Sequence, residues 1–173
     1  MLASRFFRNA VYTQADVSYT ECMHIYFGAD HGGYALKKYL LANLSSEELH
    51  ITDCGTDSKD QPDDYPDFAA DVAALVQRDP SGFGVLLCRS GEGMAMAAGK
   101  LPGIRAALVW QSTVARETRR DNDANILVLP SDFMSESEAL RCLRVFIATP
   151  FSEEPRHVRR LQKLADLERP GHV

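Results

Sequence analysis

The stretch Gly84–Lys100, GVLLCRSGEGMAMAAGK, decides how the rest of the chain is interpreted. Its apolar run Val85–Leu87 is typical of a buried parallel strand, and the Ala/Met-rich run from Met94 is typical of a helix. The glycines between them mark a tight turn, because Gly91 and Gly93 tolerate a positive φ. Converging backbone N–H groups and the positive end of the following helix favour an anion there. The pattern predicts a strand, an anion-binding loop and a helix.

Cys88 follows this strand directly, at the carboxyl end where open α/β sheets hold their ligands. A thiol near a helix N-terminus, with Arg89 beside it in sequence, has surroundings that depress a thiol pKa and suit it to act as a base or nucleophile. A buried structural cysteine beside a tight turn explains the same residues. The stretch alone leaves both interpretations open.

Length and composition are those of an ordinary globular protein. The 173 residues fit one domain with a substantial core, and 45% are hydrophobic and 25% charged. Nineteen Lys and Arg against 24 Asp and Glu give a formal charge of -5, which provides no electrostatic reason to expect a nucleic acid. No apolar run reaches the length of a membrane span. We therefore expect neither nucleic acid nor membrane as a partner.

The cysteines lack the spacing of a zinc site or of a disulfide framework. They are Cys22, Cys54, Cys88 and Cys142. Reduced thiols in a cytoplasmic protein are the simplest interpretation of this pattern.

Residues 1–22 precede the first patterned element and contain Arg5 and Arg8 ahead of any acidic residue, a weak likeness to a basic targeting leader. An appended start without a role in the fold is the simpler interpretation, since Met23 stands directly before the first predicted strand. We expect this extension to be poorly ordered and residues 23–173 to form a single domain.

Strand and helix patterns alternate from His24 onward. Strands are predicted at Ile25–Gly28, Glu48–Thr52, Val85–Leu87, Ile104–Trp110 and Asn125–Leu129. Helices are predicted at Tyr34–Leu44, from Pro66, from Met94 to about Gly99, at Ser112–Arg120 and at Ser135–Ala148. Because no hairpin signal separates the strands, this order predicts a five-stranded parallel sheet with helices on both faces and right-handed crossovers. The fold class is a Rossmann-like three-layer α/β domain.

The inner faces of two of these helices follow from their apolar spacing. They are Phe68, Val72 and Leu75 in one helix, and Leu140, Leu143, Val145 and Phe146 in the other.

The tail after Pro150 departs from the repeat. It opens with acidic residues and continues with basic ones, which favours a C-terminal helix whose charges complement its dipole. Arg156 and Arg160 lie one helical turn apart on one face, so their guanidinium groups are spaced to bind a phosphate. A solvated basic face, or a helix packed on a partner subunit, explains the same pattern.

The loop after the first predicted strand, Gly28–Gly33, is a second candidate site. In a doubly wound sheet the loops after the first and third strands border one crevice, so Asp30 and His31 are expected near Cys88. His31 has the chemistry to bind an anion or transfer protons, and Asp30 that to hydrogen-bond a sugar hydroxyl. Capping of the next helix by Asp30 or His31 is the plainer alternative.

Six motifs together resemble the type B ribose-5-phosphate isomerases, a family that includes the two subunits of galactose-6-phosphate isomerase. They are GADHGG at 28–33, DYPDFA at 64–69, LLCRSGEG at 86–93, PGIRAA at 102–107, NDAN at 122–125 and RHVRR at 156–160. The resemblance covers nearly all of the chain from His24 to Glu168. It implies aldose–ketose isomerisation of a sugar phosphate through a cis-enediol, without metal or cofactor. It also implies a homodimer or tetramer whose active sites lie at the dimer interface.

The resemblance assigns roles to individual residues. Cys88 corresponds to the base that moves a proton between the two carbons beside the carbonyl. The loop that stabilises the enediolate oxygen corresponds to the one holding Arg89, Ser90, Gly91, Glu92 and Gly93. The family positions that contact the sugar correspond to Asp30, Tyr65, Ser90 and Asn122. The hydroxyl of Ser90 would lie near the ring oxygen. The family positions that bind the phosphate correspond to His31, Arg156 and Arg160.

The chain departs from the family pattern around this site. Asp121 stands where the family has the catalytic His that opens the furanose ring, and an ionised carboxylate is a poor acid. Asp132 stands where many members have a phosphate-binding Arg. Arg89 replaces a Gly, and its side chain would either fill the crevice or supply a cation lost elsewhere. Met94 occupies a position at which some members have a Glu base, so Cys88 is the candidate base; Gly99 replaces an Asn.

Two functional hypotheses remain. The first is a sugar-phosphate isomerase, acting on ribose 5-phosphate or a related sugar phosphate. The second is a non-catalytic family member that binds a sugar phosphate or completes a partner's site. A nucleotide-binding regulatory domain is disfavoured, because the glycine-rich loop has neither a P-loop lysine pattern nor the dinucleotide fingerprint.

Overall fold

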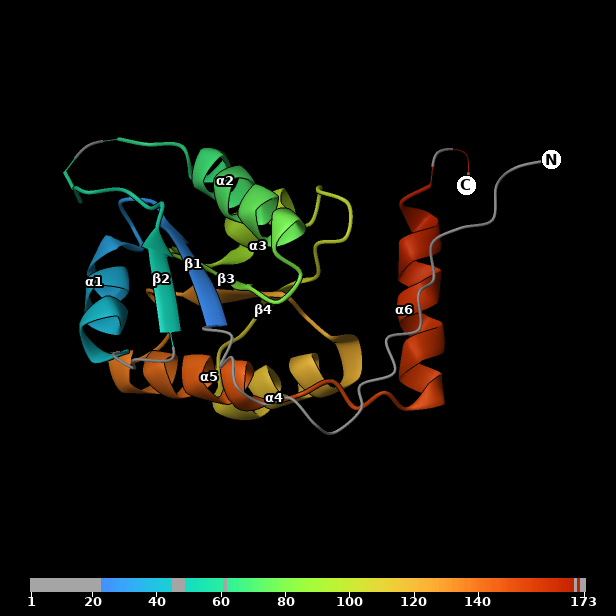
Figure 1. The fold of residues 1–173 in the computed structure, drawn as a ribbon. Helices are drawn as coiled ribbons and strands as arrows, with labels where there is room; N and C mark the ends of the chain where they lie inside the picture. Colours follow the sequence, from blue (N-terminus) through green and yellow to red (C-terminus); the bar gives the residue numbers. More distant parts are fainter. Residues whose placement is uncertain (1–22, 45–48, 61, 170, 172–173) are drawn as a thin grey trace.

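The computed structural model describes residues 23–44, 49–60, 62–169 and 171 (Figure 1). The predicted N-terminal extension lies outside these residues. In the described part, parallel strands form one sheet in the order β2-β1-β3-β5-β4. The strands are β1 (Met23–Ala29), β2 (Leu49–Asp53), β3 (Phe83–Cys88), β4 (Ala106–Leu108) and β5 (Ile126–Pro130). The predicted α/β fold class is therefore confirmed.

Helices cover both faces of the sheet (Figure 1). They are α1 (Tyr34–Asn43), α2 (Tyr65–Arg78), α3 (Glu92–Ala98), α4 (Ser112–Asn122), α5 (Glu136–Ala148) and α6 (Pro155–Leu167). One apolar core lies between the sheet and α1, α4 and α5, and the other lies between the sheet and α2 and α3. Among the described residues, no helix has the length and apolar content to cross a membrane.

Strand β3 lies at the centre of the sheet and is buried from Gly84 to Cys88. Its side chains alternate between the two cores: Val85 and Leu87 face α1 and α5, whereas Leu86 and Cys88 face α2 and α3. This period-two alternation directs the Cys88 thiol toward α3, the helix that follows it in the chain.

The chain leaves β1 toward β2 on one side of the sheet, whereas β3 lies on the other side. This is the topological switch point at which the loops after β1 and β3 border one crevice. Further along, β5 inserts between β3 and β4, so β4 becomes an edge strand with β5 as its partner. The strand predicted at Ile104–Trp110 is consequently reduced to Ala106–Leu108, because it has a neighbour on one side only.

The predicted inner faces of two helices are confirmed at Val72, Leu143 and Phe146 and differ elsewhere. In α2 the buried residues are Ala69, Val72, Ala73 and Val76, and in α5 they are Ala139, Cys142, Leu143 and Phe146. Phe68, Leu75, Leu140 and Val145 are partly buried and pack at the margins of the cores. The reason is close approach: a Cβ on Gly28 or Gly84 would lie 2.8 Å from the Val72 side chain. Small residues therefore occupy the centre of the α2 contact.

Helix α6 stands apart from the layers and touches α4 (Figure 1). Its buried residue is His157, whose Nδ1 lies 2.7 Å from the Ser152 hydroxyl. Val158, Leu164 and Leu167 remain 48%, 48% and 61% exposed. The predicted C-terminal helix is present, with an apolar stripe that stays exposed in the part of the chain that the structure describes.

Candidate active site

The Cys88 thiol lies at the carboxyl end of β3, where the loop turns into α3. Its Sγ accepts a hydrogen bond from the backbone N–H of Gly91 over 3.2 Å. Gly91 is the N-cap of α3 and has a φ of 78°, a conformation that glycine tolerates best. Gly93 does not use the positive φ that glycine tolerates, because this residue lies inside α3. Its missing side chain instead leaves room for the Tyr65 ring, which lies 2.8 Å from where a Cβ would be.

The electrostatic surroundings of Cys88 differ from the expectation. Burial raises the pKa of the thiol; the N–H groups of Met94 and Gly91 lower it in part, and the charge of Asp30 raises it. The depressed pKa suggested by the sequence is therefore wrong for the single chain. Cys88 is only 6% exposed, and the guanidinium of Arg89 lies next to Asp132 instead. A thiol in this state is predominantly neutral at pH 7 and a strong base once ionised.

Asp30 belongs to the loop after β1 and is buried beside β3. Its backbone N–H donates to the carbonyl of Leu87 over 3.3 Å, and its Oδ1 accepts from the N–H of Gly33 over 2.9 Å. Burial raises the pKa of the Asp30 carboxyl. Gly33 is the N-cap of α1, so neither Asp30 nor His31 is the helix cap that the plainer interpretation suggested. The structure thus brings a carboxyl group with increased affinity for a proton next to Cys88.

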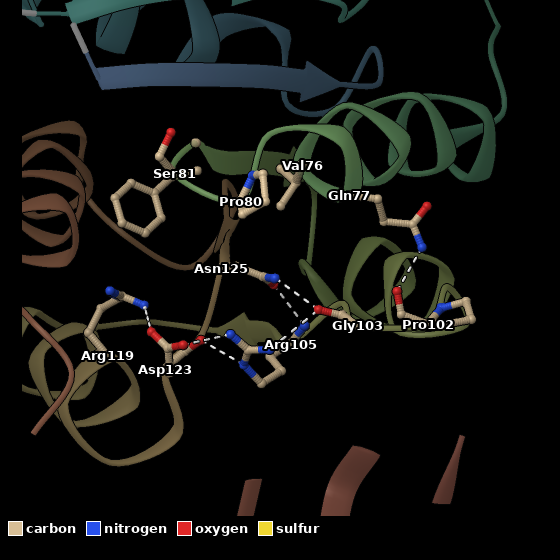
Figure 2. A pocket seen from close by; sticks show the side chains of 12 residues that line it. Val76, Gln77, Pro80, Ser81, Pro102, Gly103, Arg105, Arg119, Asp123 and Asn125 are labelled. Atoms are coloured by element: carbon tan, nitrogen blue, oxygen red, sulfur yellow. Dashed lines mark hydrogen bonds and ion pairs between the residues drawn. The ribbon is translucent and has the colours of Figure 1, made fainter. Parts of the chain in front are cut away.

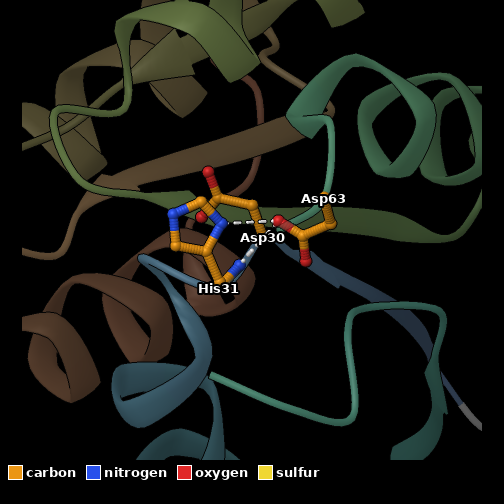
Figure 3. A group of neighbouring side chains, drawn as sticks. All are labelled: Asp30, His31 and Asp63. Atoms are coloured by element: carbon orange, nitrogen blue, oxygen red, sulfur yellow. Dashed lines mark hydrogen bonds and ion pairs between the residues drawn. The ribbon is translucent and has the colours of Figure 1, made fainter. Parts of the chain in front are cut away.

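His31 is fixed by Asp63, a residue that the sequence analysis did not single out (Figure 3). Oδ1 of Asp63 lies 2.6 Å from Nδ1 of His31 and accepts the His31 backbone N–H over 3.1 Å. Burial opposes ionisation of Asp63, but the hydrogen bonds from His31 outweigh it and lower the pKa of the carboxyl. Because an ionised carboxylate only accepts, Nδ1 carries a proton and Nε2 is left for another partner.

Asp30, His31 and Asp63 each offer an atom within 4.8 Å of the other two, a spacing that can hold a cation (Figure 3). The direct hydrogen bond between His31 and Asp63 already uses one ligand atom of each. We therefore describe this group as a polar cluster that orients His31.

Arg89 and Tyr65 lie beside two of the glycines near Cys88, Arg89 at Gly32 and Tyr65 at Gly93. A Cβ on Gly32 would lie 2.6 Å from Cγ of Arg89, so the Arg89 stem covers the loop after β1. The Arg89 guanidinium lies 3.4 Å from Asp132, which follows β5. Tyr65 begins α2 and is 39% exposed. Ser90 and Glu92 belong to the turn between β3 and α3, with Glu92 as the first helical residue.

The remaining predicted site residues lie at the other edge of the sheet. Helix α4 starts beyond the carboxyl end of β4 and ends just before β5, so Asp121 and Asn122 lie near the amino ends of the strands. Asp121 accepts from Nε of Arg120 over 2.8 Å, and this hydrogen bond lowers the pKa of its carboxyl. Nδ1 of His157, on α6, lies 3.7 Å from Asp121. A single chain does not bring these residues to Cys88.

Arg156 and Arg160 also belong to α6. Arg156 pairs with Glu154 over 2.9 Å, and Arg160 borders a shallow hollow along the helix with Leu164 and Leu167. The two arginines therefore lie on α6, the helix that projects from the domain. This helix contacts α4, which carries Asp121 and Asn122.

Comparison with known proteins matches residues 25–164 to the family described as Ribose/Galactose Isomerase. The chain belongs to this isomerase family. Ribose-5-phosphate isomerase B of Mycolicibacterium paratuberculosis is 39% identical over 147 residues, covering 85% of this chain and 92% of the relative. The predicted family and the predicted class of enzyme, an isomerase, are thereby confirmed.

Solved structures of the family agree in fold. The type B ribose 5-phosphate isomerase of Trypanosoma cruzi is 37% identical, with a TM-score of 0.80 over 84% of this chain and 96% of that one. Ribose-5-phosphate isomerase B of Mycoplasma genitalium, solved with bound ribulose-5-phosphate, is 36% identical, with a TM-score of 0.80 over 84% of this chain and 96% of that one.

A cavity of about 510 Å³ lies at the amino edge, away from Cys88 (Figure 2). Arg105 and Arg119 line it and share Asp123, at 2.8 and 2.7 Å. Arg119 also donates to the carbonyl of Ala124 over 2.7 Å and stacks over the Phe83 ring at 4.7 Å. The Asp123 carboxylate is thus shared by two arginines, and the contacts of Arg119 join α4 to the start of β5. None of the residues that line this cavity is among the predicted site residues.

Proposed function

We propose that the chain interconverts the aldose and ketose forms of a sugar phosphate through a cis-enediolate, with Cys88 as the base. The relatives named ribose-5-phosphate isomerase B support a sugar phosphate as substrate. The observation that carries the Cys88 assignment is its position: Sγ lies 3.2 Å from the Gly91 amide and next to the buried Asp30. Ribose 5-phosphate and ribulose 5-phosphate are the substrates that we would test first.

In this mechanism the Cys88 thiolate removes the proton from the carbon beside the carbonyl. The electron pair of the broken C–H bond forms the double bond of the enediolate, whose oxygen takes the negative charge. Backbone N–H groups of the turn that begins at Ser90 are preorganised donors for that charge. The thiol then returns the proton to the neighbouring carbon, and one hydroxyl proton moves between the two oxygens. A raised thiol pKa makes the thiolate scarce but a stronger base.

Asp30 suits a hydroxyl of the sugar. Its raised pKa increases the share of protonated carboxyl, which can both donate and accept a hydrogen bond. His31, with Nδ1 held by Asp63, offers Nε2 to the substrate. Tyr65 lies against α3 at Gly93 and would contact the sugar from the other wall of the crevice.

A second copy of the chain would complete the site. Asn122 and Arg160 lie at the edge of the sheet opposite Cys88, so one chain cannot use all these groups on one small substrate. The exposed Leu164 and Leu167 of α6 supply an apolar surface for a partner. We therefore propose a homodimer, alone or within a tetramer, in which α6 of each chain carries Arg156 and Arg160 to the other chain's crevice.

A sugar-phosphate-binding protein without catalysis is the second candidate. Two observations favour it: burial raises the pKa of Cys88, and the hydrogen bond from Arg120 keeps Asp121 ionised and unsuited to donate a proton for ring opening. A chain with these properties would bind a sugar phosphate and turn it over poorly.

Isomerisation assays in both directions distinguish these functions. Turnover of ribose 5-phosphate or ribulose 5-phosphate that Cys88→Ala abolishes, and that Cys54→Ala retains, is the expected result. Cys54 is the matched control, because it too follows a strand of the sheet and is a free thiol. Binding of both sugars without turnover would instead establish the non-catalytic function.

Asp121→His tests why ring opening would be slow. If only the acid is missing, this change should raise turnover of cyclic ribose 5-phosphate and leave turnover of the linear ribulose 5-phosphate nearly unchanged. Equal changes for both substrates would show that position 121 has another role.

A further inference from the structure

We propose that Arg89 and Asp132 form a releasable ion pair, in which Arg89 binds the phosphate group of the substrate and Asp132 competes for it. The inference deepens the proposed function and rests on it. It assigns to Asp132 a role in setting how tightly the site holds an anion.

The first step is the position of the pair. Arg89 follows Cys88 directly, and its carbonyl accepts the backbone N–H of Asp132 over 3.0 Å. The N–H of Ser131 donates to the carbonyl of Cys88 over 2.9 Å. These two backbone hydrogen bonds tie the segment after β5 to the segment that carries the thiol. The pair therefore lies at the turn that follows Cys88.

The second step is the anchoring of the Arg89 stem. Cγ of Arg89 lies 2.6 Å from the place of a Cβ on Gly32, so the stem is laid across the loop that carries His31. Any larger residue at position 32 would displace it. The Arg89 side chain as a whole is 67% exposed, so its charged end can turn toward a ligand while Cγ stays beside Gly32. Gly32 follows His31 directly, which places Arg89 next to the loop that carries His31.

The third step is the weakness of the pair. The single N–O distance is 3.4 Å, and the two side chains are 67% and 46% exposed, a geometry in which an ion pair contributes little. A phosphate dianion has twice the charge of a carboxylate and offers the planar guanidinium two parallel hydrogen bonds. The phosphate therefore displaces Asp132 from Arg89. The free energy needed to break the ion pair between Arg89 and Asp132 lowers the affinity for the phosphate.

Calorimetric titration of the full chain with inorganic phosphate and with ribose 5-phosphate tests this. Arg89→Met keeps the apolar stem over Gly32 and removes the charge, and we expect it to weaken both affinities about tenfold. Asp132→Asn frees Arg89 and should tighten both by about threefold. In the double variant Asp132→Asn should have no effect, because its action passes through Arg89. Arg141→Met is the matched control, since Arg141 is a 68% exposed arginine paired with Glu138 on α5.

Two results would overturn the proposal. One is an Arg89→Met affinity within twofold of the wild type. The other is an equal gain from Asp132→Asn with and without Arg89, which would mean that Asp132 repels the anion directly. Calorimetry measures binding and needs no turnover. A wild-type chain that binds ribose 5-phosphate through Arg89 but does not isomerise it would refute the proposed isomerisation and leave the proposed role of Arg89 standing. Melting temperatures of the variants check that each is folded.

Discussion

The carboxyl and amino edges of the sheet both gather charged side chains, but they pair them differently. At the carboxyl edge, Arg89 and Asp132 form an exposed, long ion pair, and the side chains of Cys88 and Asp30 accept hydrogen bonds from backbone N–H groups. At the amino edge, Arg119 is 8% exposed and shares Asp123 with a second arginine at short distances. The carboxyl edge keeps hydrogen-bonding and charged groups available for a ligand, whereas the amino edge pairs such groups within the chain.

Polar groups that are paired within the chain and polar groups that remain available to a ligand therefore lie in different parts of this fold. The cavity at the amino edge is large, yet its polar atoms are occupied by one another. The crevice at the carboxyl edge has a raised pKa at both Cys88 and Asp30, which marks groups whose charged forms lack full compensation. We expect the reaction to take place where the charged forms of side chains are not fully stabilised by neighbouring groups of the chain.

Mixing two inactive variants tests the division of the site between the edges. Cys88→Ala and Asn122→Ala should each abolish isomerisation, and refolding them together should restore about a quarter of wild-type activity. Half of randomly assembled dimers are hybrids, and each hybrid has one intact site. Activity of the refolded mixture is the measurement. A mixture as inactive as its components would mean that each chain forms its site alone.

Removing the charge of Arg119 tests the structural role of the amino edge. Arg119→Met should lower the free energy of unfolding by about 2 kcal/mol, because it removes one of the two arginines paired with Asp123 and leaves the buried carbonyl of Ala124 without its hydrogen bond from Arg119. The measurement is chemical denaturation, with Arg116→Met as the control, since Arg116 is exposed on the same helix. Equal losses in the two variants would contradict this role.

The reactivity of Cys88 toward iodoacetamide tests the carboxyl edge. Because burial raises the pKa of the thiol, labelling should be slow at pH 7 and rise about tenfold per pH unit toward alkaline pH. Mass spectrometry after labelling at several pH values locates the modified cysteine. A midpoint below the ordinary thiol pKa would show that the assembled site activates Cys88 and that burial in the single chain does not govern it.

Asp63→Asn should have the smallest effect. The lowered pKa of Asp63 means that its stabilisation is complete above its ordinary value of 3.8 and is lost as the pH falls through the lower folded-state pKa. At pH 7 the variant should lose about 1 kcal/mol of unfolding free energy, the typical net contribution of one hydrogen bond. Urea titrations at pH 7 and below pH 3 measure this. A difference that persists at the lower pH would exclude a role for ionised Asp63.

Much of the fold could be predicted because local patterns carried it. The alternation of strands and helices and the run Val85–Leu87 follow from propensity and periodicity, and both are present. The position of Cys88 at a strand end follows from the same pattern. The family was recognised from six short motifs, which have fixed spacing along the chain.

Other features depended on neighbours that are distant in sequence. The shortening of β4 comes from its place at the edge, beside β5. The role of Asp63 comes from its contact with His31, 32 residues away, and its signal in the sequence was only an acidic pair before Tyr65. Arg119 is a buried charged residue. The sequence of α4 contains several charged residues and does not indicate which of them is buried. In each case the deciding partner was set by the topology.

The sequence by itself determined the α/β class and the glycine-containing turn after β3, because these depend on residues within about twenty positions of one another, and the family resemblance made Cys88 the candidate base. Only the tertiary structure decided which side chains lie at which edge of the sheet, how the Cys88 pKa shifts, and which arginines are bound within the chain. The physical reason is that burial and pairing are properties of three-dimensional neighbourhoods. A thiol beside an arginine in sequence is, in space, a buried thiol packed against α2 and α3, with that arginine paired to a carboxylate that follows another strand.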